Sequence, residues 1–208
     1  MDWLASTRER IRSLRNLNTT FRSNFAEIGV DEIARRYFVM NAFDGALTIL
    51  GVVVGFLVSG EQNPSFVLHA GVGAGLAMGI SGAVGAYMAE MAERQQQLRE
   101  LEAHMFKSLE GTKMSRVIHQ AALWVAFIDG ISPAGAAAIP IIPFLLASRG
   151  MIPIQIGIIA SILLDIILLF LLGIFLGKIS GGNVWLRGFL MMSAGLVTIV
   201  LMLAIGLV

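Results

Sequence analysis

The chain contains no cysteine and few charged residues, and both shortages limit what it can be. Without cysteine there is neither a disulfide framework nor a thiolate metal site, so any metal must be held by carboxylate, imidazole, thioether or carbonyl groups. Only 14% of the 208 residues are charged, whereas 56% are hydrophobic, and the mean hydropathy is +0.79. This is the composition of a membrane protein, and its 23 glycines fit closely packed helices.

Motifs of enzymes and nucleic-acid-binding proteins are also missing. The segment around Ser132, GISPAG, is not a G-x-S-x-G nucleophile elbow, and the sequence has no glycine-rich phosphate loop with its lysine. No nucleic-acid-binding fold surrounds the arginines near the N-terminus. We therefore expect neither an enzyme nor a partner of nucleic acids.

Five apolar stretches are long enough to cross a bilayer as helices. They lie at about 37–59, 66–88, 117–147, 153–177 and 184–207. The predicted fold class is therefore an all-α integral membrane protein with about five transmembrane helices and a cytoplasmic helical insertion between the second and third. The expected divisions are a basic amphipathic arm over 1–36, transmembrane helices 1 and 2 over 37–88, a cytoplasmic helix over 89–116, and transmembrane helices 3 to 5 over 117–208.

Positive charge is distributed unequally between the two sides of these spans. Of the 15 Lys and Arg residues, all except Arg149 fall on the side that carries the N-terminus. The positive-inside rule then predicts a multi-pass membrane protein with its N-terminus in the cytoplasm and its C-terminus outside, in the cell membrane if the source is prokaryotic. The basic arm is expected to lie on the anionic inner surface of the lipid bilayer.

The first span carries an aspartate, Asp44, within the stretch MNAFDGALTILGVVVG. An ionised carboxylate in a transmembrane helix costs about 2.5 to 3.5 kcal/mol, so we expect it to face a partner, a cavity or an ion. Glycines on the same helix remove side-chain bulk and let another backbone or a solute approach. The pattern favours a transport helix with Asp44 on its working face.

Two further acids lie in the third and fourth spans. The third span contains three prolines, at Pro133, Pro140 and Pro143. Because proline removes a backbone donor and bends a helix, we expect this span to be broken or kinked near residues 130–135, with freed carbonyls beside Asp129 for a cation site of oxygen ligands. Asp165, among large aliphatic residues, is equally compatible with a proton carrier, a partner for a basic residue or a buried protonated acid.

The second span is rich in glycine and should pack against other helices. We expect packing roles for four glycines of the first two spans: Gly45, Gly51, Gly75 and Gly79. In the helix that follows, Met91, Leu98 and Met105 recur every seven residues, which is typical of a helix that pairs with a neighbour or with its own copy. Its acids, among them Glu90 and Glu93, are alternatively hard ligands that collect divalent cations.

The motif DGALTILGVVVG, with Arg36 eight residues before Asp44, resembles the first-span signature of the vacuolar iron transporter family. ISGAVGAYMAEMAERQ and AAAIPIIPF then resemble, in the same order, the family's second span with its cytoplasmic helix and its third span. The resemblance extends over residues 32–208. It implies a homodimer with a path between its subunits that carries Fe2+ or Mn2+ out of the cytoplasm in exchange for protons, with Asp44 in the metal path.

The chain departs from the family pattern at the end of the second span. Where the family has a methionine and then Gly-Glu-Tyr, this chain has Gly82 and then Gly-Ala-Tyr, so a thioether and a carboxylate are missing. We expect Met40, Met78 and Asp129 to compensate, which is our own inference and not part of the resemblance. Thioether ligands would favour Fe2+ over Mg2+ or Ca2+.

The leading hypothesis is a divalent transition-metal transporter with Asp44 and Asp129 in the membrane site and Asp165 in proton coupling. The divalent metal ion is then a transported substrate, and no tightly bound cofactor is expected. Two alternatives stay open: a non-transporting membrane scaffold or regulatory subunit that holds a partner, and a proton-coupled carrier of another solute.

Overall fold

The structure, a computed structural model, describes residues 30–106, 108 and 113–206. These residues form five α-helices and no strand: α2 (Val30–Ser59), α3 (Pro64–Met105), α4 (Lys113–Ser148), α5 (Ile154–Ser180) and α6 (Val184–Ile205). All five are long and apolar enough to cross a membrane, so the predicted all-α membrane fold is confirmed. Of the predicted arm, residues 1–29 lie outside the described residues, and 30–36 form the first turns of α2.

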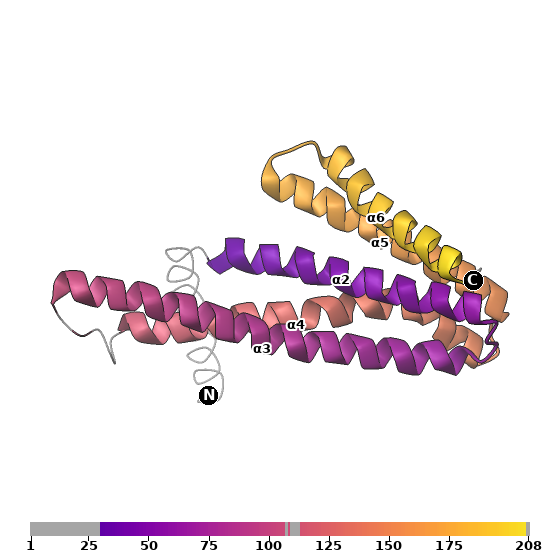
Figure 1. Ribbon diagram of the computed structural model, residues 1–208, viewed down its shortest axis with the longest axis horizontal. Coiled ribbons are helices and arrows are strands. Elements are labelled where there is room, and N and C mark those ends of the chain that lie inside the picture. The colour runs from indigo at the N-terminus through magenta and orange to yellow at the C-terminus, as the bar shows by residue number, and fades with distance from the viewer. Residues whose placement is uncertain (1–29, 107, 109–112, 207–208) are drawn as a thin grey trace, which may run out of the picture.

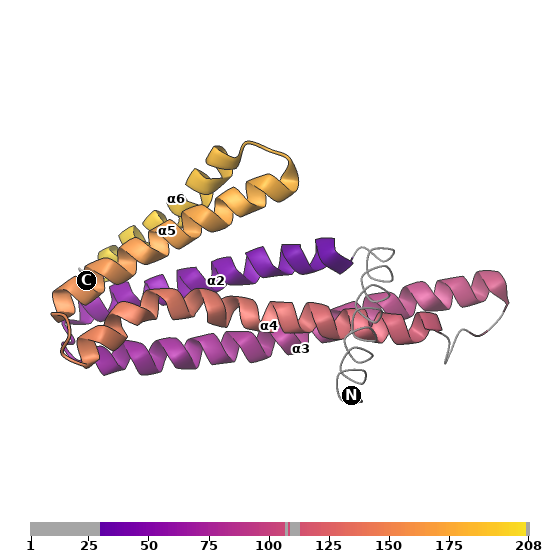
Figure 2. The ribbon, with the colours of Figure 1, turned by 180° about the vertical axis from the view of Figure 1, so that it is seen from behind.

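The helices form a three-helix layer and an inclined hairpin. Helices α2, α3 and α4 lie side by side along the long axis of the molecule, and α5 with α6 forms the hairpin (Figure 1). The hairpin lies close to the other helices at the end where α5 begins and diverges from them toward the end where α2 begins (Figure 2).

Helix α3 is longer than a bilayer requires. Its 42 residues correspond to about 63 Å at 1.5 Å per residue. Asn63 caps its start, because the side-chain oxygen accepts a hydrogen bond from the Ser65 amide at 3.0 Å, and Pro64 occupies the first turn, where no donor is needed. The predicted second span and the start of the predicted cytoplasmic helix thus form one continuous helix, whose far end projects beyond α2 beside the start of α4 (Figure 1).

Helix α4 is continuous through all three of its prolines. The predicted break near residues 130–135 is therefore wrong, and of the two alternatives only a bend remains; Figure 2 shows the curved course of this helix. Each proline removes one hydrogen bond from the helical ladder, and the bonds on either side hold the helix together. Close packing of α2 and α3 against the proline region supports it further.

Glycines bring α4 close to α2 and α3. A Cβ atom at Gly45 would lie 2.5 Å from the carbonyl oxygen of Pro133, and one at Gly79 would lie 2.7 Å from the carbonyl oxygen of Gly130. Gly75 is also buried against α4. A side chain at Gly45 or Gly79 would force the helices apart, so these residues set the spacing of the three-helix layer.

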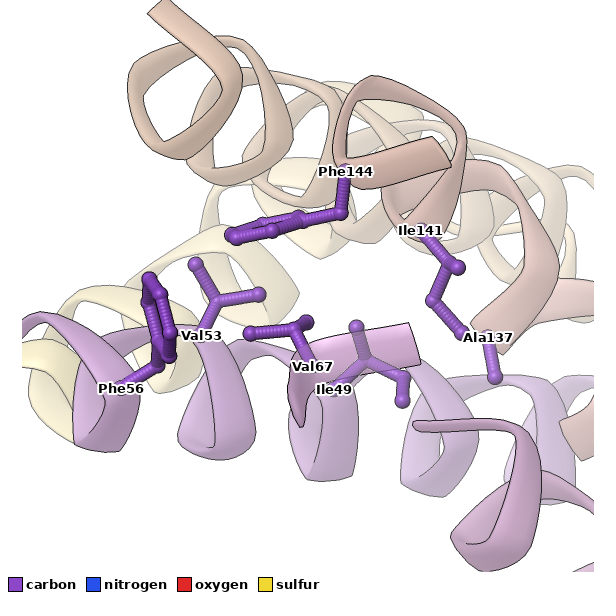
Figure 3. Close-up of a cluster of buried hydrophobic side chains, with 7 residues drawn as sticks. All are labelled: Ile49, Val53, Phe56, Val67, Ala137, Ile141 and Phe144. Carbon is purple, nitrogen blue, oxygen red and sulfur yellow. The ribbon is translucent and has the colours of Figure 1, made fainter. Parts of the chain in front are cut away.

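An apolar core joins α2, α3 and α4 near the end where α2 stops. Its seven buried side chains are Ile49, Val53, Phe56, Val67, Ala137, Ile141 and Phe144 (Figure 3). The rings of Phe56 and Phe144 meet edge to face with centroids 5.6 Å apart. Because this core fills one half of the layer with hydrocarbon, the polar side chains between the helices gather in the other half.

Candidate functional site

Asp129 lies in α4 where three helices meet. The residue is only 3% exposed. Asn41 of α2 donates hydrogen bonds from its side-chain amide to the carboxylate oxygen Oδ1 and, at 3.1 Å, to the backbone carbonyl of Tyr37. Helix α3 leaves room for the carboxylate, because a Cβ atom at Gly82 would lie 2.8 Å from Asp129 Oδ2. Helix α2 therefore holds this carboxylate in place, and helix α3 makes space for it.

A second oxygen of Asp129 faces the same space. Pro133 has no N–H group, so the main-chain carbonyl of Asp129 lacks the donor that a helix normally supplies four residues later. This carbonyl oxygen lies 3.4 Å from the Cβ position of Gly82. Carboxylate and carbonyl oxygens are the ligands that hard divalent cations prefer. The position next to Gly82 thus offers part of an oxygen-ligand site.

Asp44 lies one turn along α2 from Asn41 and faces outward. Its side chain is exposed in the single chain, and so is Met40 one turn earlier, which is 57% exposed. Thr48 donates a hydrogen bond to the main-chain carbonyl of Asp44 at 2.8 Å and not to its carboxylate. Asn41, which is hydrogen-bonded to Asp129, lies one turn before Asp44 on the same helix. Two carboxylates therefore lie on the same stretch of the bundle, one facing inward and one outward.

The other predicted ligands lie on α3. Met78 is half-buried one turn before Gly82 and on the same face of the helix. Glu90 is buried and forms an ion pair with Arg94, with 3.4 Å between Nε and Oε2, whereas Glu93 is exposed. Glu90 thus has the ordinary basic partner that an acid on a helix finds four residues away.

The projecting end of α3 borders a cavity of about 470 Å³ together with the start of α4. The lining residues are Met91, Gln95, Leu98, Arg99, Glu102, Ser108, Ile118 and His119. Neither Glu90 nor Glu93 is among them. In the part of the chain that the structure describes, no three His, Asp or Glu residues gather closely enough to hold a metal ion. The metal-collecting role of Glu90 and Glu93 therefore stays a prediction.

Asp165 is separate from the other two acids. It lies on the buried face of α5 and has no exposed surface, and neither of its carboxylate oxygens has a hydrogen-bond partner among the described residues. Four residues earlier, the Ser161 hydroxyl donates a hydrogen bond to the carbonyl of Pro140 at 2.6 Å. The structure thus brings Asp44 and Asp129 near each other and leaves Asp165 alone among hydrocarbon.

Comparison with known proteins identifies the family. A sequence model described as the VIT family matches residues 35–118. An uncharacterized protein of Methanocaldococcus jannaschii is 35% identical over 173 residues, which are 82% of this chain and 87% of that relative. The chain belongs to the VIT family. The resemblance to vacuolar iron transporters is thereby confirmed, and the five membrane-crossing helices agree with a multi-pass membrane protein.

The VIT family indicates transport of metal ions across a membrane as the class of function, and its members are transporters and not enzymes. The matched residues cover nearly all of α2, all of α3 and the start of α4. They include Asn41, Asp44 and Gly82 and end before Asp129 and Asp165. The roles of the two later acids therefore depend on the geometry of this chain.

Two polar residues beside the acids were missed in the sequence. Asn41 is an amide in an apolar span, three residues before Asp44, and Ser161 lies one turn before Asp165. Both are detectable as polar side chains at helical spacing from an intramembrane acid. Gly82 was interpreted only as a missing thioether, whereas the structure shows that it makes room for Asp129.

Proposed function

We propose that this VIT family member is a homodimeric transporter that moves Fe2+ or Mn2+ out of the cytoplasm in exchange for protons. One observation carries the proposal. Two oxygens of Asp129, its carboxylate Oδ2 and its proline-freed carbonyl, lie on the same side against Gly82, and Asn41 donates a hydrogen bond to the other carboxylate oxygen. A pair of oxygen ligands within a membrane bundle suits a passing divalent cation.

The neighbouring side chains suit a transition metal. Asp44 would add a second carboxylate, and Met40 and Met78 would add thioethers from α2 and α3. A ligand set of carboxylate and carbonyl oxygens alone would serve Mg2+ or Ca2+ equally well, whereas thioether sulfur selects softer ions. We therefore assign Fe2+ as the preferred substrate, with Mn2+ as the harder alternative.

The outward-facing Asp44 supports a homodimer. A carboxylate on the lipid-exposed surface of a span costs about 2.5 to 3.5 kcal/mol, and a second copy of the chain would remove this cost by enclosing it. Helix α3 also exposes a row of small residues at four-residue spacing: Gly73, Ala77, Ser81 and Gly85. A Cβ atom at Gly51 of α2 likewise meets nothing within 4 Å in the single chain. Exposed small residues at this spacing favour close helix association in a membrane.

The distribution of basic residues sets the expected topology, and the topology places the two ends of the proposed path. With the N-terminus in the cytoplasm, the projecting end of α3 also lies in the cytoplasm, and Glu93 is exposed there to the incoming ion. From this end the ion would reach Asp129 and Asp44 and leave at the opposite end, where α4 and α5 are connected. The C-terminus then lies outside.

Uptake of Fe2+ and Mn2+ into proteoliposomes tests the proposal. We expect Asp129→Asn and Asp44→Ala to lower the initial rate at least 10-fold. The control is Glu61→Gln, which changes an exposed acid in the connection between α2 and α3. Equal uptake by wild type and both site variants would reject the assigned site.

Two further outcomes would favour the alternatives. If the wild type moves no cation and a specific partner co-purifies with it, the chain is a scaffold or regulatory subunit. If protons move with another solute and not with metal, the chain is a carrier of that solute.

Cross-linking of single-cysteine variants at exposed positions of α3, such as Ser81→Cys, tests the dimer separately.

A further inference from the structure

Asp165 is the buried acid that the metal site does not use, and its surroundings are unusually dry. On α5 it lies between Ser161 and Leu169, both fully buried. Leu169 belongs to an apolar cluster with Ala46 and Leu50 of α2, and a Cβ atom at Gly195 of α6 would touch Leu169. The next turn of this face of α5 thus packs against apolar side chains of α2 and α6, and Asp165 itself is fully buried.

No charged group compensates Asp165 among the described residues. Both carboxylate oxygens lack hydrogen-bond partners, and the surrounding helices present no ion to them. On α4 the nearest titratable residue is Asp129, seven residues before Ala136, which is about 10 Å along a helix. On α2, Asp44 is exposed on another face, and on α6, Arg187 is exposed near the start of the helix.

The contacts of α5 with α4 show what lies beside the carboxyl group. The two helices run in opposite directions, the Ser161 hydroxyl donates a hydrogen bond to the carbonyl of Pro140, and Asp165 lies one turn farther along α5. Asp165 therefore lies alongside the segment between Ala136 and Pro140. Since Pro140 has no N–H group, the carbonyl of Ala136 lacks its helical donor. An acceptor for one proton thus lies on the helix facing Asp165.

We propose that Asp165 is a proton-binding site, neutral while α5 packs against α4, and that its carboxyl group donates its proton in a hydrogen bond to the carbonyl of Ala136. Loading forms one O–H bond on the carboxylate from a proton of water, and unloading returns that proton to water. The ionised form is unfavourable in a dry apolar site, so release of the proton requires water to enter between α5 and α4.

The location of this site suits proton exchange. It lies nearer than Asp129 to the end where α4 and α5 are connected, which is the outer end in the expected topology. In this respect the inference rests on the proposed function, because a proton arriving from outside would reach Asp165 before it reached the metal site. Protonation itself does not depend on transport and can be measured separately.

Infrared difference spectroscopy of the purified protein during a pH titration measures protonation. We expect the carbonyl stretch of a protonated carboxyl group to be present in the wild type and absent from Asp165→Asn and Asp165→Leu. The leucine variant fills the site with hydrocarbon and keeps the packing. Pro140→Ala gives the Ala136 carbonyl a helical donor, so the band should move to the frequency of a more weakly bonded carboxyl group. If the band is the same in all variants, Asp165 is not the protonated group.

Transport in proteoliposomes measures coupling. With a pH gradient, we expect wild-type metal transport to accelerate about 10-fold and both Asp165 variants to lose this acceleration, while metal-for-metal exchange, which needs no proton, is kept. Ser161→Ala, which removes a neighbouring hydroxyl but no titratable group, should respond as the wild type does. Full gradient-driven transport by Asp165→Leu would overturn the coupling role. If the wild type moves no metal at all, the proposed function fails, and the infrared result still decides protonation.

Discussion

Replacement of Gly82 by alanine should disturb the carboxylate of the candidate site directly. The new Cβ atom would lie 2.8 Å from Asp129 Oδ2 and 3.4 Å from the main-chain carbonyl oxygen of the same residue. The carboxylate would have to retreat by roughly half an ångström to restore ordinary contact in a close-packed interior. Asn41 holds the other carboxylate oxygen, so the retreat also weakens that hydrogen bond.

The magnitude follows from these two effects. Overpacking of this kind costs about 1 to 3 kcal/mol, and a hydrogen bond to a charged group contributes about 1.5 to 3 kcal/mol. We expect Gly82→Ala to destabilise the protein by about 1 to 3 kcal/mol, because the carboxylate adjusts and does not lose its partner entirely. For a chain of this size that corresponds to about 2 to 4 °C of melting temperature per kcal/mol. Metal affinity should fall about 10- to 100-fold, as when the support of a ligand is lost.

Gly135→Ala is the matched control. Gly135 is an exposed glycine of α4, six residues after Asp129, and a Cβ atom there meets nothing within 4 Å. Alanine at that position should be neutral or stabilising by up to about 1 kcal/mol, because it is the better helix former. Thermal unfolding in detergent and metal uptake should separate the two variants. If Gly82→Ala melts and transports like Gly135→Ala, the carboxylate of Asp129 does not occupy the space beside Gly82.

Three further changes test other parts of the structure. Asn41→Leu leaves the buried carboxylate of Asp129 without its donor and should lower the free energy of unfolding by about 1 to 3 kcal/mol, measured by chemical denaturation. Arg94→Met leaves Glu90 buried without its ion-pair partner and should cost about 3 kcal/mol or more, measured in the same way. The backbone amides of the two residues after Glu61 donate to its carboxylate and hold its pKa below the ordinary 4.5, so this stabilisation is present above that pH and is lost as the pH falls through the lowered value. Glu61→Gln should therefore flatten the acid side of the melting-temperature profile.

The spans were predictable from the sequence because a helix that crosses a bilayer needs about twenty apolar residues in a row. This requirement depends only on consecutive residues and not on contacts between distant parts of the chain. The passage of the second span into a cytoplasmic helix was predictable as well, because no proline interrupts the chain between them. Helix α4 was predicted less well. Its prolines predicted a break or a bend, and close contact with Gly45 and Gly79 keeps the helix continuous.

The candidate site was predictable only in part, because its defining contacts join distant parts of the chain. Asp129 stood out as an acid in an apolar span, but its donor Asn41 lies 88 residues away in the sequence. The role of Gly82 was hidden for the same reason, because only the structure shows that Asp129 occupies the space that a side chain at Gly82 would fill. Periodicity identifies faces of helices, and the pairing of those faces is a tertiary property.

The three intramembrane acids differ in the surroundings that stabilise their carboxylates, and this difference indicates which part of the bundle should move. Asp129 has a donor and room, and it lies between helices that glycines hold within backbone contact. Asp44 faces outward on that same layer, where the second chain of the proposed dimer would enclose it. Asp165 lies on the hairpin, whose helices diverge from the layer at one end (Figure 2), and its charge can form only if water reaches it. A change in the protonation of Asp165 should therefore act on the contact between α5 and α4, so the hairpin should move while the three-helix layer stays fixed.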